Sequence, residues 1–128
     1  MLLKSLFKPT ENKWQPIVRA LEAILGKDGV IQRKDELLTY ECDGLTGYRQ
    51  RPAIAVLPRT TEQVAAVVKL CHEHQIPWVA RGAGTGLSGG ALPLADGLLI
   101  VTARMRQILS VNLENQRVVV QPGVINNW

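Results

Sequence analysis

Residues 81–90 read Arg-Gly-Ala-Gly-Thr-Gly-Leu-Ser-Gly-Gly, and five of these ten residues are glycine. The run follows a short apolar segment at 76–80, which predicts a strand that leads into a loop. Glycine leaves the backbone N–H groups accessible because it has no Cβ. A nest of such N–H dipoles suits a phosphate or diphosphate, and Arg81 would add positive charge at the entrance of the loop.

The run also matches a known nucleotide motif in part. Gly84 to Gly89 fit G-x-G-x-x-G, the dinucleotide fingerprint of Rossmann folds, but that motif needs a helix directly after it. Here Pro93 falls where the first helical turns would lie, and Asp96-Gly97 predicts a turn. A Walker A loop is excluded because no Lys-Ser or Lys-Thr closes the run. Two interpretations stay open: a loop that holds a diphosphate through its own backbone, and a flexible loop between strands.

Composition narrows the class of protein. The chain has 128 residues, of which 46% are hydrophobic and 20% charged, and this predicts one soluble, globular domain. Aromatic residues make up only 5%, which argues against a platform on which bases stack. The net charge of +4 is spread along the chain without a basic block, so we expect no nucleic-acid partner.

No metal site is predicted. Cys42 and Cys71 do not form a C-x-x-C pair, and we expect both to be partly buried thiols of a reducing compartment. His72 and His74 are two residues apart, which places them on different faces of a helix. Asp43 precedes a glycine and is interpreted as a turn or cap residue rather than a general base. No catalytic residue is assigned.

The sequence predicts neither a signal peptide nor a membrane span. Lys4 and Lys8 interrupt the apolar residues of the N-terminus, and no other stretch approaches the length of a span. We therefore expect a cytoplasmic protein, which reaches a membrane only where a partner carries it there.

Hydrophobic periodicity predicts an α+β or α/β domain. The expected elements, in chain order, are a helix at 17–25 after Pro16, a short helix at 36–40, a strand at 53–57, a helix at 62–74 capped by Thr60 or Thr61, strands at 76–80 and 98–102, and a hairpin of 109–113 with 117–121.

Four segments in a fixed order carry a family resemblance that is more specific than the glycine run. They are Tyr40-Glu41-Cys42-Asp43-Gly44-Leu45, residues 52–64, Val79 to Gly90, and Val118-Val119-Val120-Gln121-Pro122-Gly123-Val124. Together they resemble FAD-linked oxidases of the vanillyl-alcohol oxidase and p-cresol methylhydroxylase (PCMH) superfamily. Within it the match is nearest to the group of the glycolate oxidase flavin subunit and the D-lactate dehydrogenases.

The resemblance implies an α+β fold, the N-terminal part of a PCMH-type FAD-binding domain with a small mixed or parallel sheet and flanking helices. Residues 1–48 would be an N-terminal helical segment and 49–128 the first part of that domain. The chain stops after 124–128, where a new element is expected to begin, and the family's later FAD loops and substrate domain are missing. We therefore expect a truncated, incomplete domain.

The same resemblance implies a set of cofactor-binding residues. The loop 82–86 would wrap the diphosphate of FAD, Gly89 and Gly90 would allow close approach, and Pro122 and Gly123 would line the site near the ribityl or adenosine portion. Arg81 would either face the diphosphate or pin the loop through a backbone bond. Some relatives attach the flavin through a loop histidine, and because Thr85 stands at the comparable position we expect non-covalent FAD. The implied set is Arg81, Gly82, Ala83, Gly84, Thr85, Gly86, Gly89, Gly90, Pro122 and Gly123.

The implied function is that of an FAD-dependent 2-hydroxy-acid oxidase or dehydrogenase, to which this chain contributes the diphosphate-binding loop. Its substrate would be a small 2-hydroxy acid, and its partners would be other oxidase subunits, including an iron–sulfur subunit. Catalysis by these residues alone is not expected, because the cofactor supplies the redox chemistry and the substrate region is missing. Two alternatives stay open: a non-catalytic truncated product and a stand-alone nucleotide-binding module.

Overall fold

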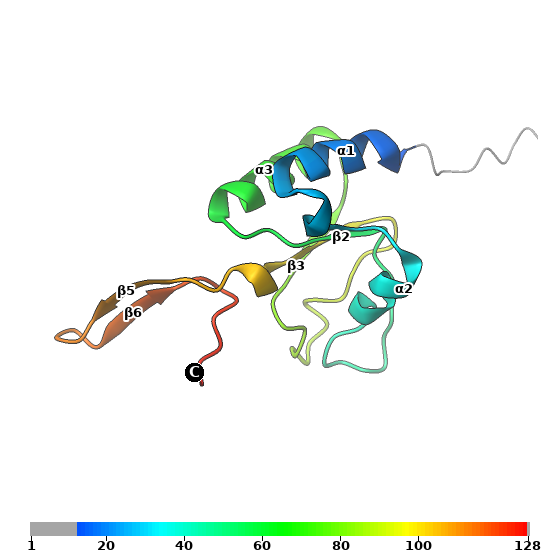
Figure 1. Ribbon diagram of the computed structural model, residues 1–128. Helices are drawn as coiled ribbons and strands as arrows, with labels where there is room; N and C mark the ends of the chain where they lie inside the picture. Colours follow the sequence, from blue (N-terminus) through cyan, green and yellow to red (C-terminus); the bar gives the residue numbers. More distant parts are fainter. Residues whose placement is uncertain (1–12, 128) are drawn as a thin grey trace, which may run out of the picture.

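A four-stranded sheet lies at the centre of the fold in the computed structural model, which describes residues 13–127 (Figure 1). Its strands are β1 (Val30–Ile31), β2 (Ile54–Val56), β3 (Trp78–Arg81) and β4 (Leu98–Val101), in the order β1-β2-β4-β3. β2 and β3 run parallel to β4, whereas β1 is antiparallel to β2. The predicted α+β fold with a small mixed sheet is therefore confirmed.

The two central strands are buried on both faces. Ile54, Val56, Leu98 and Ile100 belong to one core cluster, and the residues between them, Ala55 and Leu99, belong to a second. Successive side chains of a strand point to opposite faces, so each strand divides its residues between two cores. A parallel strand that is covered on both sides reads as a continuous apolar run, which is how both strands look in the sequence.

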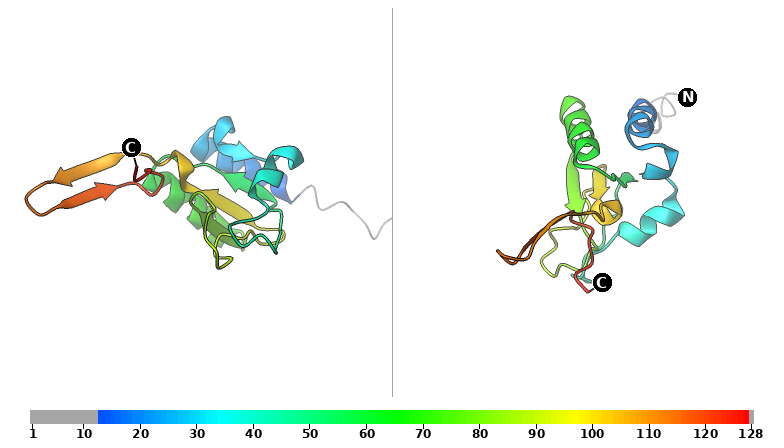
Figure 2. Two further views of the ribbon diagram at one scale, coloured as in Figure 1. Left: turned by 90° about the horizontal axis from the view of Figure 1, so that it is seen from below. Right: turned by 60° about the vertical axis from the view of Figure 1, so that its left-hand side comes forward.

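Helices α1 (Trp14–Leu25) and α3 (Thr61–Glu73) cover one face, while α2 (Lys34–Leu37) and the 3₁₀ turn η3 (Leu38–Tyr40) cover the other (Figures 1 and 2). Thr60 caps α3, as predicted, because its side chain accepts a hydrogen bond from the amide of Gln63 at 3.2 Å. α1 ends at Leu25, also as predicted, with Gly26 as its C-cap, but it begins two residues before Pro16. Proline fits there because the first turn of a helix needs no internal N–H donor.

The main differences from the predictions concern β3, the short helix after β1 and β1 itself. The strand expected at 76–80 is Trp78–Arg81, because its register pairs Trp78 with Leu98 and Arg81 with Val101. The helix expected at 36–40 is divided into α2 and η3. The short strand β1 carried no periodic signal, since two residues are too few to show an alternation, and only its pairing with β2 reveals it.

The predicted hairpin is confirmed as β5 (Ile108–Asn112) paired with β6 (Arg117–Val120), and it projects from the domain as an arm (Figure 2). Every residue of its two strands is exposed. The buried residue Gln121 holds the base of the hairpin through two hydrogen bonds to Gln107. The backbone N–H of Gln121 donates to Gln107 O at 2.9 Å, and the side-chain Oε1 of Gln121 accepts from Gln107 N at 2.9 Å.

Within residues 13–127, no helix combines the length and the apolar character that crossing a bilayer would require. The prediction made for the N-terminal residues 1–9 lies outside the described part of the chain.

Candidate functional site

The three parallel strands end at one edge of the sheet. Each is followed there by a different segment: β2 by Leu57 and Pro58, β3 by the glycine loop 82–90, and β4 by the 3₁₀ turn η4 (Thr102–Arg104). In open sheets of this kind, ligands bind in the crevice outside the carboxyl ends of the strands. The fold therefore brings the glycine loop to the edge at which a ligand is expected.

The glycine loop is open on one side. A Cβ built on Gly82, Gly86 or Gly90 would meet no other atom within 4 Å. Gly84 and Gly89 adopt positive φ angles of 75° and 76°, a backbone conformation that side chains rarely tolerate. No helix follows the loop among the described residues, so a diphosphate there would be bound by backbone amides of the loop without a helix N-terminus. The loop thus fits the cofactor that the sequence implies.

The other side of the loop packs on the segment 40–45. Arg81, the last residue of β3, donates from Nη1 to the carbonyl oxygen of Cys42 at 2.5 Å, and its guanidinium lies over the ring of Tyr40 at 5.6 Å. Of the two roles considered for Arg81, the structure contains the bond to the backbone. Whether this residue also contacts a cofactor stays a prediction.

A cavity of about 300 Å³ lies between the start of the glycine loop and the chain after β6. Gly82 and Ala83 line one side of it, and Pro122 and Gly123 line the other. These two pairs are 40 residues apart in the sequence, and the family resemblance groups them as well. The remaining lining residues were not predicted: Ala103, Arg106, Val124 and Ile125.

Close packing at Gly123 shapes this cavity. A Cβ at Gly123 would come within 2.6 Å of Thr102 O and 2.7 Å of Met105 O, so only glycine fits. Its amide donates to Met105 O at 2.8 Å, which ties the chain after β6 to the turn after β4. Arg106 was missed because one arginine among fifteen basic residues carries no signal of its own. Its Nε donates to Ala103 O at 2.7 Å.

The remaining predicted residues do not line this cavity. Thr85 and Gly86 are exposed further along the loop, Gly90 is also exposed, and Gly84 and Gly89 are partly covered. The site is therefore an extended surface, with a cavity at one end and the open face of the loop running away from it.

Asp43 is the described side chain with a buried polar atom that lacks a hydrogen-bond partner. Its Oδ1 accepts from the amide of Leu45 at 2.9 Å, which confirms the turn interpretation. Its Oδ2 is buried and has no partner among the described residues. The side chain thus stiffens the turn that packs under the glycine loop.

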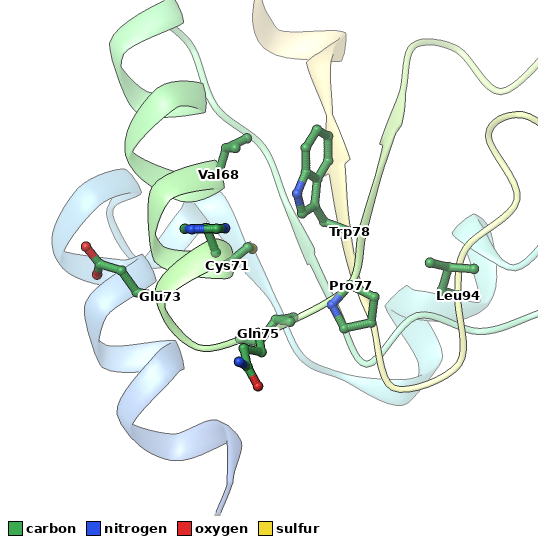
Figure 3. A pocket seen from close by; sticks show the side chains of 9 residues that line it. Val68, Cys71, Glu73, Gln75, Pro77, Trp78 and Leu94 are labelled. Atoms are coloured by element: carbon green, nitrogen blue, oxygen red, sulfur yellow. The ribbon is translucent and has the colours of Figure 1, made fainter.

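A larger hollow of about 810 Å³ lies elsewhere, beside the start of β3 (Figure 3). Val68 and Cys71 line it from α3, and Trp78 lines it from β3. It is at the amino end of a parallel strand, opposite to the edge at which ligands bind in such sheets. Burial raises the pKa of the Cys71 thiol, which keeps it protonated near neutral pH. We do not assign the cofactor to this hollow.

Within the described residues, no group of three or more His, Cys, Asp or Glu side chains has a geometry that could hold a metal ion. His72 and His74 are exposed at the end of α3, as predicted. Cys42 and Cys71 are free thiols.

Comparison with known proteins adds an independent line of evidence. A family model described as an FAD binding domain matches residues 52–127. The chain is 53% identical over 97 residues to the glycolate oxidase subunit GlcD of Escherichia coli (strain K12), which covers 76% of this chain and 19% of that protein. It is 46% identical over 79 residues to a D-lactate dehydrogenase of Anaerostipes hadrus, which covers 62% of this chain and 17% of that protein.

Solved structures agree with these matches. The crystal structure of p-cresol methylhydroxylase with substrate bound superposes with a TM-score of 0.75 at 32% identity, over 90% of this chain and 23% of that one. The chain thus spans about a fifth of the length of the curated relatives that it matches.

Proposed function

The chain belongs to the FAD binding domain family of the PCMH-type oxidase superfamily, whose cofactor is FAD. From this premise we propose that residues 81–90 hold the diphosphate of FAD and that Pro122 and Gly123 line the site near its ribityl or adenosine portion. One observation carries the proposal: Gly82-Ala83 and Pro122-Gly123 line a single cavity at the carboxyl edge of the parallel strands. A backbone that is free of side chains on its open face is what close approach to a diphosphate requires.

The chain's own residues would bind and orient the cofactor. Amides of the loop 82–86 would donate to diphosphate oxygens, and Gly89 and Gly90 would leave room for the rest of the molecule. Arg106, at the wall of the cavity, would add positive charge beside the phosphates. Gly123 would keep the cavity wall close to η4, because its missing Cβ lets the two segments touch.

The whole protein would be an FAD-dependent 2-hydroxy-acid oxidase or dehydrogenase. Bound FAD supplies the redox chemistry of such an enzyme by accepting the two electrons and the α-hydrogen of a 2-hydroxy acid. The names of the two curated relatives support this reaction class, since glycolate and D-lactate are both 2-hydroxy acids. We assign the 128 residues to cofactor binding and no catalytic role to any of them.

We propose partners and a location as well. One relative is named as a subunit, which supports a protein that works with other oxidase subunits. An iron–sulfur subunit would be among them. We place it in the cytoplasm, with any membrane association supplied by such partners. Co-purification from native extract, followed by iron analysis of the bound subunits, tests this.

Attachment of FAD would be non-covalent. Thr85 stands at the loop position at which some relatives carry a flavin-linked histidine, and a threonine side chain offers no imidazole nitrogen for that bond. Acid precipitation of the FAD-loaded protein should leave the flavin in the supernatant. Flavin that stays in the washed pellet would contradict this.

Calorimetric titration of the 128-residue chain tests the proposed function. FAD and ADP should both bind with one site per chain and compete with each other, because both carry the diphosphate. Riboflavin, which has the ring system without any phosphate, should not bind. Binding of riboflavin but not of ADP would overturn the assignment of the loop to the diphosphate. If FAD did not bind at all, the proposed function of this chain would be wrong.

A further inference from the structure

The segment 40–45 is not among the predicted cofactor residues, yet it forms the floor under the glycine loop. Gly44 lies against the carbonyl oxygens of Thr85 and Gly86, and Leu45 lies against Gly89. Cys42 accepts the hydrogen bond from Arg81, across 39 residues of sequence. Residues 40–45 therefore contact the glycine loop along its length, from Arg81 at its start to Gly89 near its end.

Gly44 lets the 40–45 segment approach the backbone of the loop closely. A Cβ at this position would be 2.7 Å from both Thr85 O and Gly86 O and 3.0 Å from the side chain of Leu87, so the packing leaves no room for a side chain here. A Cβ at Gly86 itself would meet nothing within 4 Å. The segment 40–45 therefore supports the loop at Gly44 while Gly86 stays open.

Arg81 holds the start of the loop. Its guanidinium contacts Cys42 O and the ring of Tyr40, and it fills the space that a side chain at Gly84 would need. The side chain of Arg81 therefore makes its contacts within the protein and lies between the loop and the 40–45 segment. A cation placed in this way acts on a bound anion through the loop backbone rather than by contact.

We infer that Tyr40, Gly44 and Arg81 are positioning residues, which set the glycine loop in its anion-binding conformation before the cofactor arrives. The inference rests on the proposed function. Glycine-rich loops lose more conformational freedom on ordering than other segments, so a loop that is ordered in advance binds more tightly. The 40–45 segment supplies that order through one hydrogen bond, one cation–π contact and one close backbone approach.

The salt dependence of FAD binding separates positioning from direct contact. Arg81→Gln should weaken the affinity for FAD about tenfold, the loss expected for one hydrogen bond from a charged donor. It should flatten the slope of affinity against ionic strength less than a change at a contacting cation would, because the lost charge lies behind the loop rather than against the phosphates. Arg106→Gln, a matched change at the cavity wall, should flatten that slope. Arg81→Lys should rescue only in part, since an ammonium cannot reproduce the planar donor group.

Hydrogen exchange supplies a second readout that needs no cofactor. In the free chain, Arg81→Gln and Tyr40→Leu should each speed exchange of the amides in 82–90, with exchange in β2 and β4 unchanged. Gly47→Ala, a substitution into open space, serves as the control that should alter neither. If the wild-type chain fails to bind FAD, the proposed function fails, while the exchange data still decide the inference.

Two results would overturn the inference. A salt slope that is flattened as much in Arg81→Gln as in Arg106→Gln would mean that the guanidinium of Arg81 contacts the diphosphate itself. Unchanged affinity together with unchanged loop exchange in both variants would mean that the 40–45 segment does not order the loop.

Discussion

The guanidinium of Arg81 occupies the space that a side chain on Gly84 would have to enter. The residue that closes β3 thereby determines what the third position of the following loop can be. Gly84 is constrained twice, because its φ of 75° also disfavours any residue with a Cβ. The glycine motif and the arginine in front of it are one structural unit.

Gly84→Ala should therefore displace Arg81 from the 40–45 segment. We expect a loss of about 1–2 kcal/mol in the free energy of unfolding from the backbone conformation, and a clear drop in affinity for FAD. Urea denaturation followed by FAD titration measures both effects. Gly82→Ala, at a position with open space and no positive φ, is the matched control for stability. Equal stability of the two variants would contradict the account.

Gly123→Ala should damage the cavity from its other side. The added methyl would press against Thr102 O and Met105 O, and overpacking of this kind costs about 1–3 kcal/mol in the free energy of unfolding. Chemical denaturation with tryptophan fluorescence is the measurement. A variant as stable as the wild type would show that the contact between the chain after β6 and η4 is looser than described.

Asp43 offers a test of the turn under the glycine loop. Asp43→Asn keeps an oxygen that can accept from Leu45 N, so we expect little change in stability. Asp43→Ala leaves that amide without its partner and should cost about 1–3 kcal/mol. Thermal denaturation of the two variants at pH 7 gives the comparison. If Asp43→Asn lost as much stability as Asp43→Ala, the charge of Asp43 rather than its hydrogen bond to Leu45 N would be the stabilising feature.

Asp96 predicts a dependence of stability on acidity. The hydrogen bond from Lys13 at 2.7 Å lowers the pKa of this carboxyl. Partial desolvation opposes this shift, and the charge of Lys13 and the hydrogen bond from Trp14 add to it. A carboxyl whose pKa is lower in the folded state stabilises above its unfolded pKa, near 3.8, and loses that contribution as the pH falls through the folded value. Both side chains are largely exposed, so the effect is under about 1 kcal/mol. Asp96→Asn should remove this part of the acid transition as the pH falls below 3.8, and an unchanged profile would contradict it.

The hairpin arm predicts self-association. Val111 pairs with Val118 across the strands, and both are more than half exposed, at 62% and 56%. Exposed apolar strands with open edges favour edge-to-edge pairing. The double substitution Val111→Lys and Val118→Lys should lower the weight-average molar mass measured by sedimentation equilibrium at high concentration. The midpoint of the thermal unfolding transition should stay unchanged. Association that persists in the double variant would place the contact elsewhere, for instance at the open edge strand β3.

The sequence by itself determined the local structure and the family. Apolar periodicity located α1 and α3, Thr60 marked a helix start, and Pro93 excluded a helix after the glycine run, because these signals act over a few residues. The order of four short motifs identified a PCMH-type FAD domain. The sequence did not predict the strand β1 or the division of the short helix into α2 and η3, because both depend on pairing and packing with distant segments.

Only the tertiary structure decided how the candidate site is assembled. The cavity between Gly82-Ala83 and Pro122-Gly123 exists because β3 and β4 are parallel and end at the same edge, which no local pattern encodes. The role of Arg81 was open in the sequence, since an arginine before a glycine loop can face either way. In the structure its guanidinium contacts Cys42 and Tyr40, because the position of a guanidinium is set by the partners that the fold brings within reach. Its contact with a cofactor stays a prediction.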